Sequence, residues 1–489
     1  STFSLEQGKW FSLPMQRLVQ GDITSPGIIL PAALILLGLT AALTVSTLKI
    51  KSPLWAAGTG GFLVLFPSVM CANIYDASAL FFSALLLSAL AVFVSVRWKF
   101  GFLGGIALLT ISCGVYSVFI GYAAGLFILV LLFELLSGDM SVKEALQKGF
   151  KYLSVLLISA ALYYVILELA LRLNGVSLMD YRGIDQIGKF SVSSIGKLVY
   201  EAYRKVYYFF FYGIFLYRGH FEIEPFFRYL NWAAVAFTVI LCGWMAVRRR
   251  IFHSLGRLAL ILALAVLFPL AIHVIAVLGQ NAYTHWIMCY PFVLVYVALL
   301  AAADQAETLP LADAQKHSFR KTEKAFRRTA TVLVLIVAVL LCRQWFFTTN
   351  QAYEYIRYQD ENLISRGIML TNDMQNASDY SESVPVAFVG SDAPQAFQYT
   401  TGDFLSIHGQ DGGGYTGYRN AVIDNERLKV LLRNWVGISF PYADAATVSQ
   451  LSANPEVAAM PVYPVRGSIA LIDGVLVVKL SEILTTPQE

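Results

Sequence analysis

Charged residues are scarce in this sequence. Lys and Arg number 36 and Asp and Glu 32 among 489 residues, so 14% of the chain is charged while 57% is hydrophobic. Ordinary soluble domains carry roughly 25% charged residues, and the mean hydropathy here is +0.61. The composition excludes an ordinary soluble enzyme and indicates a polytopic membrane protein. A net charge of +4, confined to a few loops, predicts no nucleic-acid partner.

Cysteine is also rare, and its spacing argues against a disulfide framework or a cysteine-bound metal. None of the five cysteines forms a Cys-x-x-Cys or Cys/His cluster, and we expect all of them to be small core residues: Cys71, Cys113, Cys242, Cys289 and Cys342. The glycine run Gly412–Gly414 is followed by no Lys-Ser/Thr, so it predicts a flexible turn and not a phosphate-binding loop.

Long apolar runs are what the sequence does contain. A membrane-spanning helix needs about 20 apolar residues, with some shorter or tilted. Ten such runs lie near 26–46, 52–72, 77–96, 101–116, 118–137, 152–172, 228–247, 256–279, 284–303 and 329–348. The predicted fold is therefore a polytopic α-helical membrane protein with about ten transmembrane helices.

The connections between these runs alternate in charge. Every second connection is basic: Lys49 and Lys51; Arg97 and Lys99; Lys143, Lys148 and Lys151; Arg248, Arg249, Arg250 and Arg257; then Lys316, Arg320, Lys321, Lys324, Arg327 and Arg328. The short connections 73–76, 114–117 and 280–283 hold no Lys or Arg. The positive-inside rule predicts that the basic set is cytoplasmic and the other set external.

This topology predicts that both ends of the chain are external. Residues 1–25 are polar to amphipathic and lack the pattern of a signal peptide. Either this short segment crosses the membrane together with the first run, or an upstream span that is missing here delivers it. The sequence favours the second explanation, so we expect an external amphipathic segment, then a transmembrane core over 26–348.

Two more regions are predicted to be external. Residues 173–227 include an aromatic and basic stretch, and the apolar run 206–217 is too short to span, so we expect this loop to lie along the membrane surface. Residues 349–489 have a soluble composition and predict a small extracytoplasmic α/β domain. Its expected elements are helices 351–376, 426–436 and 445–451, strands 385–390 and 404–408, and a type I′ hairpin at Asp473-Gly474.

Several of these segments resemble the GtrII-type membrane glucosyltransferases. They include SPGIILPAALILLGLTAALTV (25–45), FPSVMCANIYDASALFF (66–82), DYRGIDQIG (180–188), NAYTHWIMCYPF (281–292) and IDGVLVVKLSE (472–482). The resemblance implies an enzyme of the GT-C kind. Such an enzyme moves a sugar, usually glucose, from a polyprenyl-phosphate carrier to a cell-surface glycan or its precursor, at the outer side of the bacterial cytoplasmic membrane. It implies no cofactor, and since no ligand cluster is visible we also predict no metal.

Enzymes of the GT-C kind generally carry acidic catalytic residues in the first external loop. In GtrII-type proteins an aspartate-containing stretch precedes a Gly-Arg/Lys-Trp segment, which Gly8-Lys9-Trp10 matches. Only seven residues precede that match. The resemblance therefore leaves open whether the principal catalytic acid belongs to an upstream segment.

Glycosyl transfer needs a base for the acceptor hydroxyl. The predicted catalytic carboxylates are Asp76, Glu6 and Asp22, ahead of Asp180 and Asp185. Asp76 ranks first because it lies at the membrane rim beside Tyr75 and Asn73. The alternative for Asp76 is a water-exposed carboxylate at a helix N-terminus, which the helix dipole favours.

The leaving phosphate needs cations or hydrogen-bond donors, and the sugar needs polar and aromatic groups. The predicted substrate-binding residues are Arg182, Tyr181, Tyr75, Asn73, Lys9, Arg17, His285 and Tyr116, and the pair Arg204 and Lys205 is also on the external side. Each has a plainer alternative, since interfacial Arg and Lys meet lipid headgroups and Tyr is common at membrane interfaces. His273 is expected to be buried.

Two other functions stay open at this point. One is another GT-C sugar transferase, such as a mannosyl or arabinosyl transferase, or a glycan polymerase. The other is a transporter or flippase of lipid-linked sugars, against which stand the absence of visible inverted repeats and the large external domain. The predicted partners are a polyprenyl-phosphate sugar donor, a glycan acceptor and the lipid bilayer.

Overall fold

The computed structural model describes residues 2–21, 26–74, 78–138, 140–179, 192–212, 214–216, 220–222, 225–278, 286–310, 317–390 and 425–482. The predicted sites Asp22, Tyr75, Asp76, Tyr181, Arg182 and His285 lie outside these residues. The chain divides into two compact units, Ser1–Thr349 and Asn350–Glu489.

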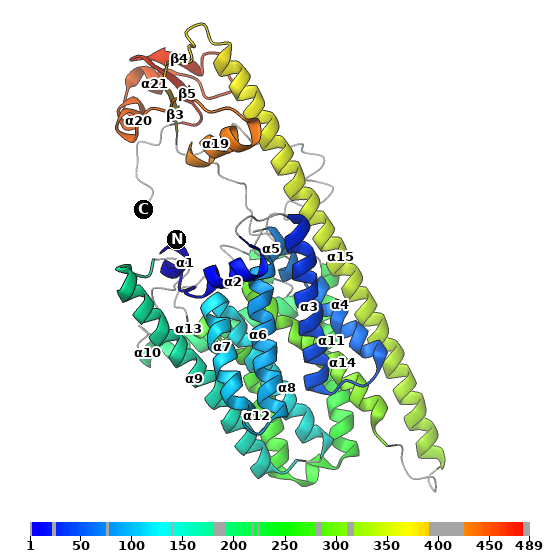
Figure 1. Ribbon diagram of the computed structural model, residues 1–489. Coiled ribbons are helices and arrows are strands. Elements are labelled where there is room, and N and C mark those ends of the chain that lie inside the picture. Colours follow the sequence, from blue (N-terminus) through cyan, green and yellow to red (C-terminus); the bar gives the residue numbers. More distant parts are fainter. Residues whose placement is uncertain are drawn as a thin grey trace. The chain divides into compact units, whose positions relative to one another are not determined.

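The first unit is a bundle of helices (Figure 1). Its α-helices are α1 (Thr2–Glu6), α2 (Ser12–Val19), α3 (Pro26–Leu48), α4 (Pro53–Leu65), α5 (Pro67–Ile74), α6 (Ser78–Arg97), α7 (Gly101–Tyr116), α8 (Ile120–Ser137), α9 (Val142–Asn174), α10 (Val192–Tyr207), α11 (Pro225–Arg248), α12 (Leu255–Ile272), α13 (Ile275–Leu278), α14 (Val293–Thr308) and α15 (His317–Gln375). Shorter elements are η1 (Ser117–Phe119), η3 (Tyr208–Tyr212), η4 (Ile251–His253), η5 (Trp286–Phe292) and an antiparallel pair, β1 (Ile214–Leu216) with β2 (His220–Glu222).

The length and composition of these helices match a membrane protein. Among the described residues, eight helices are long and apolar enough to cross a membrane, or nine if α4 and α5, bent by 44°, form one span. Residues 101–137 count once in that number, although the backbone is extended at Tyr116 and η1 separates α7 from α8. Each of the ten predicted runs is mostly helical over its described residues, with breaks at Phe66 and at His273 and Val274. The prediction of a polytopic helical fold is confirmed.

Close packing between α6 and α7 depends on small residues. A side chain at Gly105 would place its Cβ 2.1 Å from Ser95 Oγ, and one at Gly101 would meet the Val94 carbonyl oxygen at 1.8 Å. Since real Cβ atoms do not approach so closely, only glycine fits at both positions. These two helices are thereby held against each other along the half of α7 that follows the basic corner at Arg97.

An aromatic cluster fills the interior of the bundle. Trp345 packs edge-on against Phe62, Phe66 and Tyr296, with ring centroids 4.9–5.3 Å apart. Edge-to-face pairs of this kind contribute about 0.5–1.5 kcal/mol each beyond burial. The buried tyrosine hydroxyls are satisfied, because Tyr296 donates to Asn231 Oδ1 at 2.6 Å and Tyr290 to the Leu63 carbonyl at 2.8 Å.

The predicted basic connections come together at one end of the bundle, here called the basic end. Glu134 of α8 pairs with Lys49, which follows α3, and with Lys148 of α9. Lys151 donates to the Ser95 carbonyl near the end of α6. These contacts join four separate helices, so the alternation in charge along the sequence corresponds to one end of the structure.

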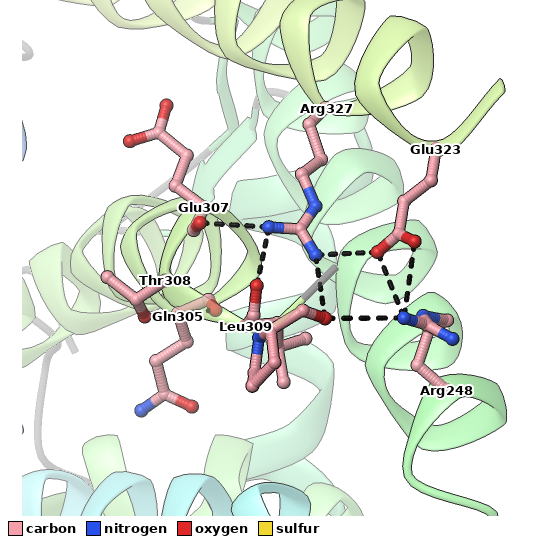
Figure 2. A network of polar contacts seen from close by, with 8 residues as sticks. Arg248, Gln305, Glu307, Thr308, Leu309, Glu323 and Arg327 are labelled. Atoms are coloured by element: carbon pink, nitrogen blue, oxygen red, sulfur yellow. Dashed lines mark hydrogen bonds and ion pairs between the residues drawn. The ribbon is translucent and has the colours of Figure 1, made fainter. Parts of the chain in front are cut away.

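A second charged network ties α11, α14 and α15 together at the basic end (Figure 2). The nearly buried carboxylate of Glu323 accepts from Arg248 at 3.1 Å and from Arg327 at 2.6 Å. Arg327 also donates to the carbonyls of Glu307 and Leu309, at the end of α14, at 3.0 and 2.6 Å. The carbonyls left without helical partners at a helix C-terminus are satisfied here by a guanidinium group.

The second unit is a small α/β fold. Its sheet has the order β3-β5-β4, formed by β3 (Val386–Val389), β4 (Ile469–Ile472) and β5 (Val475–Lys479), with β3 parallel and β4 antiparallel to β5. Helices α19 (Asn425–Leu431), α20 (Ala445–Ser452) and α21 (Pro455–Ala459) and the π-helix η6 (Leu432–Val436) complete it. Alternate strand residues enter two cores: Phe388 and Val478 pack in one, Val389 and Val477 in the other.

The predicted hairpin is confirmed. β4 and β5 are joined by Asp473 and Gly474, whose φ angles of 52° and 78° are those of a type I′ turn. Strand 385–390 and the two short helices are confirmed as well, whereas strand 404–408 and the glycine run 412–414 lie outside the described residues. The helix predicted over 351–376 is confirmed as the second part of α15, which runs without a break from His317 to Gln375.

Candidate active site

The N-terminal segment docks on the bundle at the end opposite the basic end. The Phe11 amide donates to the Gly114 carbonyl of α7 at 2.8 Å, and Tyr163 of α9 donates its hydroxyl to the Gly8 carbonyl at 2.9 Å. The Met179 amide, beyond α9, donates to the Glu6 carbonyl at 3.0 Å. Figure 1 shows α1 and α2 beside the far ends of α6 and α7. Three separate points of the bundle therefore fix this segment.

The Trp10 side chain packs the N-terminal segment against α7. Its indole lies directly against Gly114, where an added Cβ would come within 2.5 Å of Trp10 Cε2. The indole also meets the Phe11 ring edge-on at 5.5 Å, and its Nε1 is buried without a hydrogen-bond partner. The lack of a side chain at residue 114 thus makes the socket for the Gly8-Lys9-Trp10 segment.

Two predicted substrate-binding residues come together at this docked segment. Lys9 Nζ lies 5.7 Å from the centroid of the Tyr116 ring and donates to Gln7 Oε1 at 2.8 Å. The Tyr116 ring in turn packs on Phe81, with centroids 4.6 Å apart. A cation over an aromatic face, beside a backbone break at the end of α7, is suited to an anionic sugar carrier.

The other described candidates lie on neighbouring elements. Glu6 is half-buried at the end of α1, and Arg17 is exposed in the last turn of α2, which packs on α6 and α7. Asn73 is half-buried in the last turn of α5, and α5 is fixed to η5 because Ser68 donates to the Trp286 carbonyl at 2.6 Å.

A second group at this end includes Lys205, one of the predicted external cations, and His273, which was predicted to be buried. Lys205 of α10 lies within electrostatic range of His273, just after α12, and of Cys289 in η5. Burial lowers the pKa of Lys205 below its ordinary value. His273 is 1% exposed and packs edge-on against Phe292, with ring centroids 5.2 Å apart. Among the described residues, neither of its ring nitrogens has a hydrogen-bond partner.

The sequence does hold a signal for Lys205. Residues Ala202, Val206 and Phe209 are buried on one face of α10 and η3, and Lys205 shares that face at helical spacing. A lysine is unusual on the apolar face of an amphipathic helix unless its ammonium group pairs with another group or binds a ligand. His273 was expected to be buried, which is confirmed, but its two unpaired nitrogens depend on the tertiary packing of α12 and η5.

The group around Lys205 has the chemistry of an anion site. Leaving a buried polar atom without a hydrogen bond costs roughly 1–3 kcal/mol, so an imidazole with two unpaired nitrogens is retained at a cost. A bound phosphate or sugar hydroxyl would supply the missing partner, and a half-buried ammonium would attract the phosphate. Among the described residues no group of three or more His, Cys, Asp or Glu is arranged to hold a metal ion.

The fold and this end of the bundle define a polytopic helical membrane protein with a docked, cation-bearing N-terminal segment. The model of the family described as Glucosyl transferase GtrII matches residues 1–301. The chain belongs to this family, which makes it a membrane glycosyltransferase. No curated protein and no solved structure matches the chain.

Proposed function

We propose that this chain transfers glucose from polyprenyl-phosphate glucose to a cell-surface glycan or its precursor, at the outer side of the bacterial cytoplasmic membrane. The proposal is supported above all by the docked Gly8-Lys9-Trp10 segment, which holds Lys9 over Tyr116 at the end of the bundle opposite the basic end. The positive-inside rule favours an external position for that end. Lipid-linked sugars are presented to transferases on that side.

The second support is the half-buried cation on α10. Helix α10 is amphipathic, is not among the membrane-length helices, and packs on α12 and α13, with the Tyr203 hydroxyl donating to the Val266 carbonyl at 2.6 Å. An amphipathic helix at a membrane surface is a suitable place to meet the phosphate of a lipid carrier. Lys205 on its inner face would then neutralise the phosphate as it leaves.

Atoms and electrons balance in the proposed glucosyl transfer. A carboxylate takes the proton of an acceptor hydroxyl, the hydroxyl oxygen forms the new bond to the anomeric carbon, and the bond from that carbon to the phosphate oxygen breaks. The electron pair leaves with the polyprenyl phosphate, whose charge Lys205 and Lys9 offset. The proposed bases are Asp76, Glu6 and Asp22, with Arg182, Tyr181, Tyr75, Asn73, Arg17 and His285 proposed to bind substrate.

Glucose transfer by the detergent-purified chain tests this function directly. Radiolabelled polyprenyl-phosphate glucose is offered with a glycan acceptor, beside the same lipid carrying mannose or arabinose. We expect turnover with glucose and a loss of at least about a hundredfold in kcat for the alanine variant of the true base among Asp76, Glu6 and Asp22. Turnover with another sugar only would indicate a different transferase, and transport without turnover would refute the proposal.

A further inference from the structure

A cavity of about 270 Å³ lies at the basic end, away from the proposed transfer site. The C-terminal ends of α3, α8, α11 and α14 form its wall, which includes apolar side chains such as Phe133 and Met245 and the cations Lys49, Lys51 and Arg249. The lining is therefore apolar and cationic together. That combination suits a group that joins a charge to a hydrocarbon chain.

The carboxylates of this cavity are already engaged by the protein itself. Glu134 holds Lys49 at 3.1 Å and Lys148 at 2.6 Å. Asp304, only 1% exposed, accepts the backbone amides of Lys51 at 3.1 Å and of Ser52 at 2.7 Å. Glu134 is thus paired with two lysines, and the Asp304 oxygens are occupied by backbone amides.

Two cations of the wall do lack such a partner. Within the described part of the chain, no carboxylate oxygen lies within 4.0 Å of Lys51 Nζ or of the Arg249 guanidinium. Arg249 approaches Arg257 at Gly138, where an added Cβ would lie 3.8 Å from Arg249 Cδ and 3.9 Å from Arg257 Nη1. Two guanidinium-bearing side chains of like charge thus converge beside the cavity.

Helix dipoles alone do not account for this arrangement. Cations near helix C-termini are favoured by about 0.3–1 kcal/mol at exposed sites. In the network of Figure 2, the cation Arg327 contacts backbone carbonyls and a carboxylate. Lys51 and Arg249 instead border an open volume. The described residues that line the cavity include three cations, Lys49, Lys51 and Arg249, and two carboxylates, so the charged side chains of the lining sum to a positive charge.

We infer that this cavity binds a phosphate group, with Lys51 and Arg249 as its cationic contacts. The source of the phosphate is either the headgroup of an anionic phospholipid or a free phosphate anion. The apolar part of the wall favours the lipid, since Phe133 and Met245 would face its glycerol and first methylenes. The site is separate from the proposed transfer centre and does not depend on the identity of the donor.

Thermal unfolding of the full chain in neutral detergent tests the inference. Phosphatidylglycerol, phosphatidylcholine and inorganic phosphate are titrated separately, and bound lipid is counted by native mass spectrometry. We expect phosphatidylglycerol to raise the unfolding temperature and to stay bound, and phosphatidylcholine to do neither. An equal shift with inorganic phosphate would identify the free anion as the source.

The decisive comparison is between two sets of variants. The double variant Lys51→Gln/Arg249→Gln is expected to weaken phosphatidylglycerol binding by about tenfold or more, because two cations near an anionic headgroup are removed. The control, Lys99→Gln, changes an exposed lysine at another corner of the basic end and should bind like the parent. Equal binding by the double variant and the control would overturn the inference, and unfolding without lipid checks that both variants are folded.

Discussion

The docking of Trp10 on Gly114 makes a sharp prediction for Gly114→Ala. The new methyl group would lie 2.5 and 2.6 Å from two atoms of the indole, against a normal separation of about 3.5–4.0 Å. The ring is rigid, so it must move by about 1 Å or more. Forcing an extra methyl group into a packed site costs roughly 1–3 kcal/mol, and here the displaced element carries Lys9.

A matched control removes the effect of helix propensity. Replacing glycine by alanine within a helix contributes up to about 1 kcal/mol of stability, which would partly hide the cost at Gly114. Gly104 lies in the same helix, and a Cβ there would meet only Val94 Cγ2, at 3.9 Å. The difference between Gly114→Ala and Gly104→Ala therefore isolates the contact with Trp10, and we expect it to be about 1–3 kcal/mol.

Two assays measure the consequence. Thermal unfolding in detergent should place Gly114→Ala below Gly104→Ala, and glucosyl transfer should fall in Gly114→Ala alone because Lys9 no longer lies over Tyr116. In a Trp10→Ala background, Gly114→Ala should cost no more stability than Gly104→Ala, since the clash is then gone. Equal stability and equal transfer in the two glycine variants would show that Trp10 does not occupy this socket.

Three further outcomes are expected. Tyr163→Phe should lower stability by about 0.5–1.5 kcal/mol in chemical unfolding, because it loses the 2.9 Å bond to the N-terminal segment. Lys205→Met should raise KM for the lipid-linked donor while Lys197→Met, exposed on the same helix, should not, as steady-state kinetics would reveal. Asp444 caps α20 through a 2.7 Å bond from a backbone amide, which lowers its pKa below 3.8. Its contribution is thus complete above pH 3.8 and lost as the pH falls through the folded-state pKa, an acid sensitivity that Asp444→Asn should remove from the unfolding profile.

Apolar length and the placement of Lys and Arg predicted much of the first unit. A run of about 20 apolar residues can satisfy its backbone in a bilayer only as a helix, so the runs identify helices regardless of what they contact. The basic connections gather at one end because successive spans reverse direction. The Asp473-Gly474 hairpin was equally local, since the turn type follows from residues that tolerate positive φ.

Composition predicted the two helical parts of α15 but not that they are continuous. The change from apolar to polar residues near Asn350 predicted separate helices, yet α15 continues through it. The residue composition changes along α15, but a helix can continue from an apolar to a polar stretch without a change in its backbone geometry. The lack of Gly or Pro from His317 to Arg366 was the relevant signal, because these two residues interrupt helices most strongly.

The candidate active site was only partly predictable, for a physical reason. Lys9 and Tyr116 could be proposed one at a time, but their contact depends on Trp10 entering a space that exists only because residue 114 has no side chain. Neither the tryptophan nor the glycine carries that information alone. The same holds for Lys205 and His273, because α10, which carries Lys205, packs on α12 and α13, the helices that flank His273. Local patterns identify which side chains can do chemistry, and long-range packing decides which of them do it together.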